Sequence, residues 1–536
     1  MTQAALMTSG VVIPGTPEAW VATDNATRAD FRWPLAFPEI IDEMAAFYRR
    51  YVDATIAQPD HELRSILLLG RRAMPVLALL QYALLTAAAR QSGQRLVGDD
   101  LIDFLADGGD KVPPTLRPIA QPKVGTRWLW PRRLARTRSW TSTARLPRAM
   151  LFPSGVALTH NSLLRTHLRG TPDAVRNAYD EDFSYTRATP DSAFIGRIDP
   201  VGLATHMTSV LTAGVSLDDD ITGRLKATLR PVLAESYADA AELLGRLRGV
   251  RRLPARLFTG TGNKRMSRAL GLEIMRRGGD VTRCDHGGSF VLLHPPDYIA
   301  LNELSVSTRY VVPTREVADA PEMRAARDRV RPLAACTLEG ATGDPGLDVG
   351  APAFKRSTAP SKRRRAMYVS SVFYGMFQAS PPVLAGPLYL DWQTRFIEQL
   401  KALPIDLVCK PHPGGYRPPP ELDPTRGVRV ATAPFEHAVA DADVIIYDFP
   451  ATTTLAVGLC TDRPIVLVDH GTMRFNPSLR DAISARCSFV RASYDDRNRP
   501  VISNADLEAA ICAGPAIVDP TVFRRLFLGS KAAERS

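Results

Sequence analysis

The residues with the clearest chemical potential lie in the segment Lys-Pro-His-Pro-Gly-Gly, at positions 410–415. They follow an apolar run at 405–409, which predicts a buried strand that ends at this point. In open parallel sheets, ligands bind beyond the carboxyl ends of the strands. Lys410 would supply a positive charge there, His412 could donate a hydrogen bond to a phosphate oxygen, and Pro413 would stiffen the loop. These residues predict an anion site, although a simple strand exit closed by a Pro/Gly turn would have the same composition.

A second group of polar residues lies at 447–454, in Tyr-Asp-Phe-Pro-Ala-Thr-Thr-Thr. A predicted strand ends at Asp448, and hydroxyls follow at the start of a predicted helix, on Thr452, Thr453 and Thr454. The unpaired backbone N–H groups of a helix start favour anions, but threonines there can also serve as ordinary helix caps. We expect this strand to neighbour the one that ends at Lys410. The two loops together then predict one phosphate pocket.

A third motif, Asp285-His286-Gly287-Gly288, also follows a short predicted strand, at 281–284. A carboxylate and an imidazole could supply a general base, and glycines let a substrate approach the backbone. Successive residues of an extended chain point in opposite directions, so at most one of Asp285 and His286 should face a cleft. The alternative is a tight turn with a hydrogen-bonded surface histidine.

Two further positions could contact a substrate. Gly260, Gly262 and Asn263 follow a predicted strand in a pattern similar to a dinucleotide-binding loop, but the third glycine is replaced by Arg265. This segment is either a loop close to phosphate or sugar, or a plain strand–helix turn. Glu436 could hold a ribose hydroxyl, or could only favour its helix start through the helix dipole.

The elements around these motifs predict an α/β protein with an additional helical region. Strands and helices alternate from 366 to 469, which indicates a parallel sheet with helices on both faces. A βαβ unit is predicted at 255–284, and helices are predicted at 38–58, 73–91 and 217–247. The Pro-, Gly- and charge-rich segment 313–365 suggests a connection between two lobes, and 511–536 suggests a C-terminal helix or tail.

The chain of 536 residues carries 67 Lys and Arg against 56 Asp and Glu, a net charge of +11 that favours anionic partners. The tract 123–148 has eight basic residues, three tryptophans and no acidic residue. It shows no helical period, so we expect a surface loop, either merely solvated or in peripheral contact with an anionic inner membrane. No nucleic-acid motif is present. The six cysteines form no CxxC pair, and the most apolar stretch, 73–89, is short for a membrane span, so a cytoplasmic protein without a bound metal is expected.

Four segments together resemble bacterial surface-carbohydrate biosynthesis proteins, the capsule and O-antigen transferases. They are DHGGSF at 285–290, ELSVSTRYVV at 303–312, KPHPGG at 410–415 and DVIIYDFPATTTLAVGLCTDRPIVLVDHG at 443–471. More distantly, the chain is similar to capsule-polysaccharide glycosyltransferases and CDP-glycerol glycerophosphotransferases. The resemblance covers about 255–475. It implies a GT-B-like fold, with two Rossmann-like lobes and a cleft between them.

The resemblance also implies roles for the motifs. His412 and Pro413 match a motif that binds the nucleotide phosphate in these families, and Thr452 and Thr453 match a hydroxyl pair that binds the same phosphate. Relatives often have serines there, and often have Gln in place of Asp285. Residues 1–312 would hold the helical region and the acceptor-binding lobe, and 366–510 the donor-binding lobe.

The expected activity is metal-independent glycosyl transfer without a cofactor. A sugar, or a Kdo-type sugar acid, would move from a CMP- or other nucleotide-activated donor to a surface polysaccharide or its lipid-linked precursor. The alternatives are a nucleotide-sugar epimerase, a polyol-phosphate transferase, and a non-catalytic glycan-assembly protein of the same fold.

Overall fold

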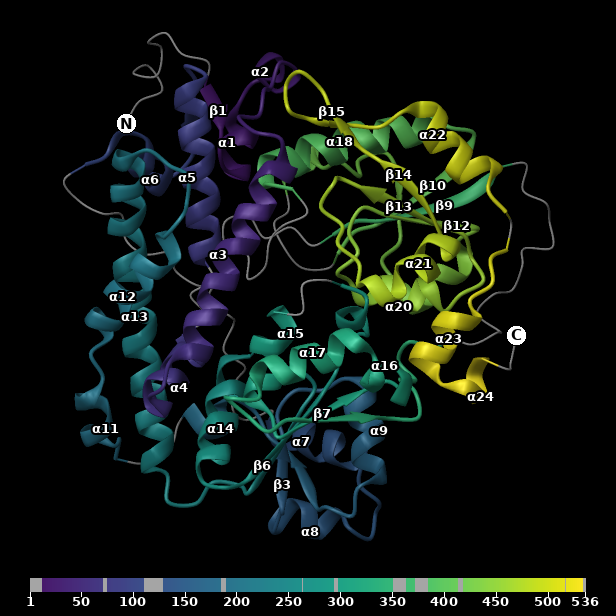
Figure 1. Ribbon diagram of the computed structural model, residues 1–536. Coiled ribbons are helices and arrows are strands. Elements are labelled where there is room, and N and C mark those ends of the chain that lie inside the picture. The colour runs from purple at the N-terminus through teal and green to yellow at the C-terminus, as the bar shows by residue number, and fades with distance from the viewer. Residues whose placement is uncertain are drawn as a thin grey trace.

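The computed structural model describes residues 12–70, 75–109, 129–184, 189–262, 264–293, 297–349, 363–371, 384–412, 418–515 and 517–533. Two six-stranded parallel sheets each form the centre of a lobe, and a group of long helices lies beside them (Figure 1). The α/β fold and the Rossmann-like, two-lobed organisation expected from the sequence are thus present. No helix within these residues has both the length and the apolar character needed to cross a bilayer.

The helical region begins with a two-stranded parallel ribbon, β1 (Val12–Pro14) with β2 (Arg95–Val97). Its helices are α1 (Pro17–Ala22), α2 (Asn25–Ala29), α3 (Phe37–Ala57), α4 (His61–Gly70), α5 (Pro75–Gln91), α6 (Asp100–Asp107), α11 (Ser192–Arg197), α12 (Pro200–Thr212) and α13 (Asp219–Gly249). In α3, Ile40, Met44, Phe47 and Tyr51 recur at helical spacing and are buried. The 31-residue α13 packs against α12, α4 and α5, and also contacts the first lobe.

The first lobe is built on the strand order β4-β3-β5-β6-β7-β8, with every pair parallel. Its strands are β3 (Gly155–Ala157), β4 (Val175–Asn177), β5 (Arg256–Thr259), β6 (Asp280–Cys284), β7 (Arg309–Val312) and β8 (Thr337–Gly340). Its helices include α7 (Leu129–Arg138), α8 (Leu146–Leu151), α9 (Ser162–Gly170), α10 (Glu181–Ser184), α14 (Arg265–Arg276), α15 (Asp297–Asn302), α16 (Arg315–Asp319) and α17 (Pro321–Val330). The strand order reverses between β3 and β5.

The second lobe has the order β11-β10-β9-β12-β13-β14, again all parallel. Its strands are β9 (Arg364–Val369), β10 (Ile405–Lys410), β11 (Arg429–Val430), β12 (Val444–Tyr447), β13 (Ile465–Asp469) and β14 (Cys487–Arg491). Its helices include α18 (Gly386–Ala402), α19 (Phe435–Ala438), α20 (Thr453–Leu459), α21 (Arg480–Arg486) and α22 (Asn504–Glu508). In chain order this is 3-2-1-4-5-6, the doubly wound order of dinucleotide-binding sheets.

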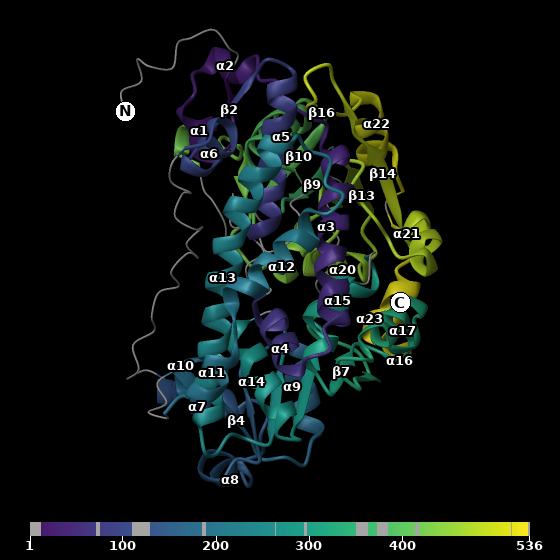
Figure 2. The ribbon, with the colours of Figure 1, turned by 60° about the vertical axis from the view of Figure 1, so that its left-hand side comes forward.

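Helix α3 ties the two lobes together on one side of the molecule. Near its start, Asp42 pairs with Arg474 of the second lobe at 3.2 Å. Near its end, Asp53 pairs with Arg329 of the first lobe at 2.7 Å. Figures 1 and 2 show α3 running alongside both lobes.

The C-terminal helix α23 (Thr521–Leu528) ties the lobes together elsewhere. It packs against α20 of the second lobe and α16 of the first. Arg525 pairs with Glu316 at 3.0 Å, and the Thr314 hydroxyl donates to the Leu526 carbonyl at 2.6 Å. The segment expected to be a C-terminal helix or tail, 511–536, therefore contains a helix that packs on both lobes, α23, followed by the short α24 (Ser530–Ala533).

Three expectations need correction. In the tract 123–148, which was expected to be a loop, residues 129–138 form α7 and residue 146 begins α8, and both helices are too short to show a clear period. The expected connection 313–365 contains α16, α17 and β8, and β8 is the edge strand of the first sheet. Arg364 and Arg365 open β9 instead of closing a linker.

Candidate functional site

Lys410 and the threonines of α20 lie on the same edge of the second sheet, but their strands are not neighbours. Lys410 ends β10 opposite Val369, the last residue of β9, and β9 separates β10 from β12. The two loops are therefore about 10 Å apart, twice the strand spacing. The expectation that they follow adjacent strands is wrong, because β9, although earlier in the chain, inserts between them. Ser370 and Ser371, which follow β9, lie at this point, where the strand order reverses.

Asp448 is an anchor below this edge. It is 1% exposed and accepts hydrogen bonds from the hydroxyls of Tyr368 (2.5 Å) and Tyr389 (2.9 Å). Burial raises its pKa to about 6. The Ser371 N–H donates to the Tyr389 hydroxyl at 2.9 Å, so one carboxyl group ties together the loops after β9 and β12. A direct contact with substrate does not follow from this geometry.

Two of the three threonines take part in the helix cap, and the third, Thr453, packs against Gly287 of the first lobe. Thr452 is the N-cap of α20, and its hydroxyl oxygen lies 2.9 Å from that of Thr454. Ordinary helix capping, the alternative to an anion site, thus accounts for the hydroxyls of Thr452 and Thr454. The half-buried Thr453 has no hydrogen-bond partner for its hydroxyl among the described residues.

On the first sheet, the structure separates Asp285 from His286. Asp285 is 3% exposed, and its carboxylate accepts from the Tyr310 hydroxyl and the Gly288 N–H, both at 2.8 Å. Burial raises its pKa. His286 is exposed. The expectation that at most one of the two residues faces a cleft is consistent with this arrangement, and Asp285 holds the turn that carries His286.

The second and third motifs meet across the lobes. Gly287 has φ +85°, and a Cβ added there would clash with the hydroxyl oxygen of Thr453 and would lie 2.8 Å from both Cβ and Cγ2 of that residue. Gly288 has φ +72°, and its added Cβ would lie 2.9 Å from the ring of Phe527 in α23. Nearby, the Asn476 N–H donates to the Leu292 carbonyl at 2.9 Å. The loops after the carboxyl ends of β6, β12 and β13 therefore touch, and these ends of the two sheets face one another.

The glycines after β5 serve packing within the first lobe. The Asn161 amide donates to the carbonyls of Gly260 (3.0 Å) and Asp285 (2.7 Å), which links the loops after β3, β5 and β6. The Gly262 N–H donates to buried Glu303 at 2.6 Å, and a Cβ at Gly262 would lie 2.7 Å from the same carboxylate. This favours the strand–helix turn over a loop open to substrate.

The remaining predicted residues are dispersed or outside the described residues. His412 is exposed just beyond β10, and Glu436 is half-buried in α19. Asn263 and Pro413 lie outside the described residues. Sequence reasoning missed Asn161, Ser370 and Ser371, because only the strand order shows that they lie where each sheet reverses.

His470, which follows β13, is also absent from the predicted site. It is 1% exposed, and neither of its ring nitrogens has a hydrogen-bond partner among the described residues. The centre of its ring lies 4.6 Å from that of Trp392, in an edge-to-face contact. Burial lowers the pKa of His470 to about 3. It is a neutral packing residue below the candidate site.

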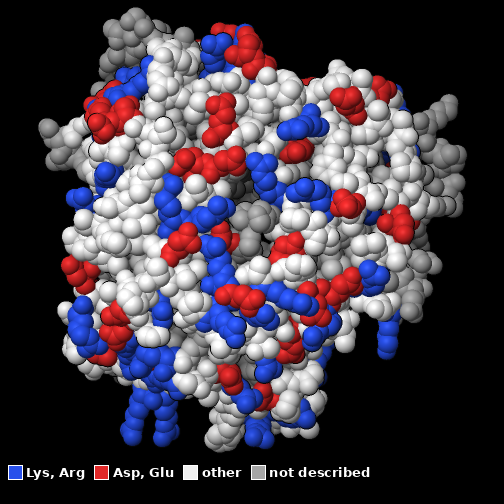
Figure 3. All heavy atoms as spheres, viewed as in Figure 1, with Lys and Arg blue, Asp and Glu red and all other residues white. Residues whose placement is uncertain are grey.

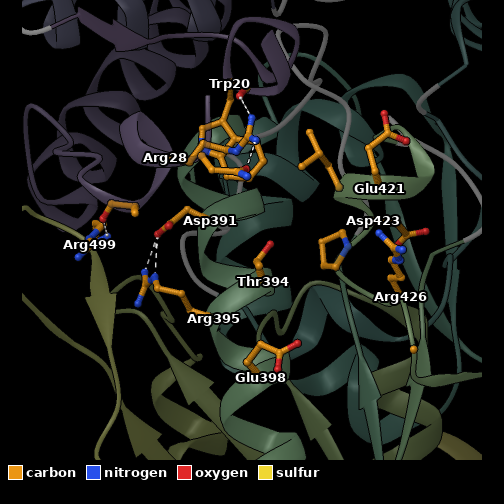
Figure 4. Close-up of a pocket in the computed structure, with 15 residues that line it drawn as sticks. Trp20, Arg28, Asp391, Thr394, Arg395, Glu398, Glu421, Asp423, Arg426 and Arg499 are labelled. Carbon is orange, nitrogen blue, oxygen red and sulfur yellow. Dashed lines mark hydrogen bonds and ion pairs between the residues drawn. The ribbon is translucent and has the colours of Figure 1, made fainter. Parts of the chain in front are cut away.

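A cavity of about 630 Å³ lies elsewhere, between the N-terminal helices α1 and α2, helix α18 and the segment 421–427 (Figure 4). Its arginines are largely engaged: Arg28 donates to the Val21 carbonyl, Arg395 to Asp391 and Arg499 to Asp495. None of the predicted site residues lines it, so it is a polar groove between the helical region and the second lobe.

Within the described ranges, no group of three or more His, Cys, Asp or Glu side chains is placed to hold a metal ion. No protein-family model matches the chain, and no curated protein matches it in sequence.

Proposed function

We propose that this chain is a GT-B-like glycosyltransferase, which moves a sugar or a Kdo-type sugar acid from a nucleotide-activated donor to a bacterial surface polysaccharide or its lipid-linked precursor. One observation carries the proposal: Gly287, after β6, packs against Thr453, after β12. Each sheet offers its carboxyl ends as a ligand-binding edge. Two such edges face to face suit a reaction that must bring a donor and an acceptor together.

In this proposal the second lobe binds the donor. Lys410 is half-buried at the end of β10, and no described residue pairs with its ammonium group. Its charge would stabilise the negative charge that develops on the leaving phosphate. The Thr453 hydroxyl and the exposed His412 would add hydrogen bonds to the nucleotide phosphates.

The first lobe would supply the base. The His286 imidazole takes the proton of the acceptor hydroxyl while a bond forms between that oxygen and the anomeric carbon. The bond from this carbon to the donor phosphate breaks, and its electron pair leaves with the nucleotide. Asp285 acts by holding the His286 turn through Tyr310 and Gly288.

A donor screen tests the activity. The protein is incubated with CMP-, CDP-, UDP- and GDP-activated sugars, with and without acceptor glycans, and nucleotide release is measured. Release that requires an acceptor supports the proposal. Sugar interconversion without an acceptor would indicate the epimerase, and glycerol phosphate transfer from CDP-glycerol the polyol-phosphate transferase. No turnover of any donor would contradict all three enzymes.

A binding measurement tests the donor site separately. Lys410→Gln and the isosteric Thr453→Val should each weaken nucleotide binding by about 1.5–3 kcal/mol, or roughly 10- to 150-fold, because each removes a polar phosphate contact. Lys401→Gln is the matched control, since Lys401 pairs with Glu398 on α18, away from the sheet edge. Equal affinities for Lys410→Gln and Lys401→Gln would refute the assignment of Lys410.

A further inference from the structure

The surface formed by α7, α8 and α9 is rich in arginines that lack a carboxylate partner. Within the described residues, Arg133 pairs with Asp182 and the neighbouring Arg256 pairs with Asp173. The remaining arginines of these helices and of the turn between them make no ion pair with a described residue: Arg132, Arg136, Arg138, Arg145, Arg148, Arg165 and Arg169. In Figure 3, basic side chains project from the lower end of the molecule in two places, one below the helical region and one below the first sheet.

Large apolar side chains stand out from the same surface. Phe152 is 76% exposed and Leu151 69% exposed, the two highest values among the large apolar residues described, and Trp130 is 59% exposed. Trp140, which the sequence suggested for this surface, is buried instead and donates its ring N–H to the Val175 carbonyl at 3.1 Å. The exposed apolar group is therefore Trp130, Leu151 and Phe152.

Helix α9 begins beside the candidate site, at Asn161, but the α8 end of this surface lies away from that site. Helices α7 and α8 contact each other and the edge strand β4. Leu151 and Phe152 come just before β3, so they lie at the amino end of the sheet, opposite the edge that faces the second lobe. In Figures 1 and 2 alike, α8 is the lowest helix of the molecule. Changes there should leave the interlobe residues intact.

The combination of arginines that make no ion pair and protruding apolar side chains indicates the chemistry of a partner. Arginines near an anionic bilayer gain from its negative surface potential, and apolar and aromatic side chains gain by entering the interface. A soluble polyanion would satisfy the arginines but would leave Leu151 and Phe152 in water. A bilayer satisfies both.

We propose that the α7–α8–α9 surface docks on an anionic lipid bilayer, with Leu151 and Phe152 entering the headgroup region and the arginines that make no ion pair contacting lipid phosphates. This goes beyond the proposed transferase activity and does not depend on it. It replaces the broader expectation for the tract 123–148 with a defined set of residues.

Co-sedimentation of the full chain with vesicles tests this proposal. Binding to vesicles of phosphatidylglycerol and phosphatidylcholine should exceed binding to pure phosphatidylcholine, and should fall as salt is added. Arg145→Gln with Arg148→Gln should weaken partitioning onto the anionic vesicles about 25-fold, or roughly five-fold for each charge removed. Leu151→Ser with Phe152→Ser should weaken it at least ten-fold.

Two control variants make the same chemical changes elsewhere. Arg480→Gln with Arg491→Gln removes two exposed charges from the second lobe, and Ile517→Ser with Val522→Ser removes exposed apolar groups near the C-terminus. Both should bind vesicles as the unchanged protein does. Equal losses in the test and control pairs would overturn the proposal. Binding of the protein to soluble dextran sulfate without binding to vesicles would also overturn it, because the arginines would then recognise a polyanion in solution.

Discussion

The contact between Gly287 and Thr453 can be tested by adding one methyl group. Gly287→Ala places a Cβ 2.8 Å from Cβ of Thr453, closer than carbon atoms approach in folded proteins. The residue also has φ +85°, where a side chain costs about 1–2 kcal/mol. Overpacking adds about 1–3 kcal/mol. We therefore expect Gly287→Ala to lower the free energy of unfolding by about 2–5 kcal/mol.

Gly278→Ala is the matched control, because Gly278 has φ +78° and an added Cβ would meet nothing within 4 Å. Gly278→Ala should lower the free energy of unfolding only by the cost of a side chain at this positive φ, about 1–2 kcal/mol. Urea unfolding measures both variants, and the difference between them isolates the contact between the lobes. Thr453→Gly removes the clashing side chain, so the double variant Gly287→Ala with Thr453→Gly should recover that difference. Equal losses for the two alanine variants, or no recovery, would refute the face-to-face arrangement of the sheets.

Four further predictions concern single side chains. His286→Gln should lower turnover by about 10²–10⁴ while leaving nucleotide affinity unchanged, and an unchanged rate would remove His286 as the base. Asp448 holds its proton more tightly in the folded protein, with a pKa of about 6, so its contribution to stability is present below pH 4 and is lost as the pH rises through 6. Urea unfolding should show the unchanged protein gaining stability over Asp448→Asn, by up to about 3 kcal/mol, as the pH falls from 7 to 4. Burial lowers the pKa of His470 to about 3, so the contribution of its neutral ring to the free energy of unfolding is lost as the pH falls below 6.5. His470→Phe should keep the contact with Trp392, and at pH 4 it should lose about 3 kcal/mol less stability to acid than the unchanged protein. The Asn476 amide donates to the Val291 carbonyl across the lobes at 2.7 Å, so Asn476→Ala should cost about 1–3 kcal/mol in the same assay, and a loss below 0.5 kcal/mol would contradict a buried interlobe bond.

Much of the second lobe could be predicted from sequence, because its signals are local. Apolar runs such as Ile405–Lys410 and Ile465–Asp469 form strands as expected, and the apolar positions of α18 mark a helix. In the first lobe, β3 and β4 have only three residues each and escaped prediction. Elements this short carry too little pattern, and long-range pairing stabilises them, β3 with β5 and β4 with β3.

The candidate site shows the same division. The residue types at 285–288, 410–412 and 452–454 indicated general-base and phosphate chemistry, and the alternation of side chains along a strand indicated that Asp285 and His286 would part. The sequence could not show that Asp448 would be sealed under two tyrosines, or that Asn161 would join three loops.

The sequence by itself determined the α/β character of the chain, the positions of the motifs at strand ends and the basic character of 123–148, since each depends on neighbouring residues alone. The tertiary structure decided that β9 lies between β10 and β12, that Thr453 meets Gly287, and that Trp140 is buried while Leu151 and Phe152 protrude. These depend on strand order and on packing between segments far apart in the chain. Local periodicity says which face of an element is apolar, but not which partner covers it.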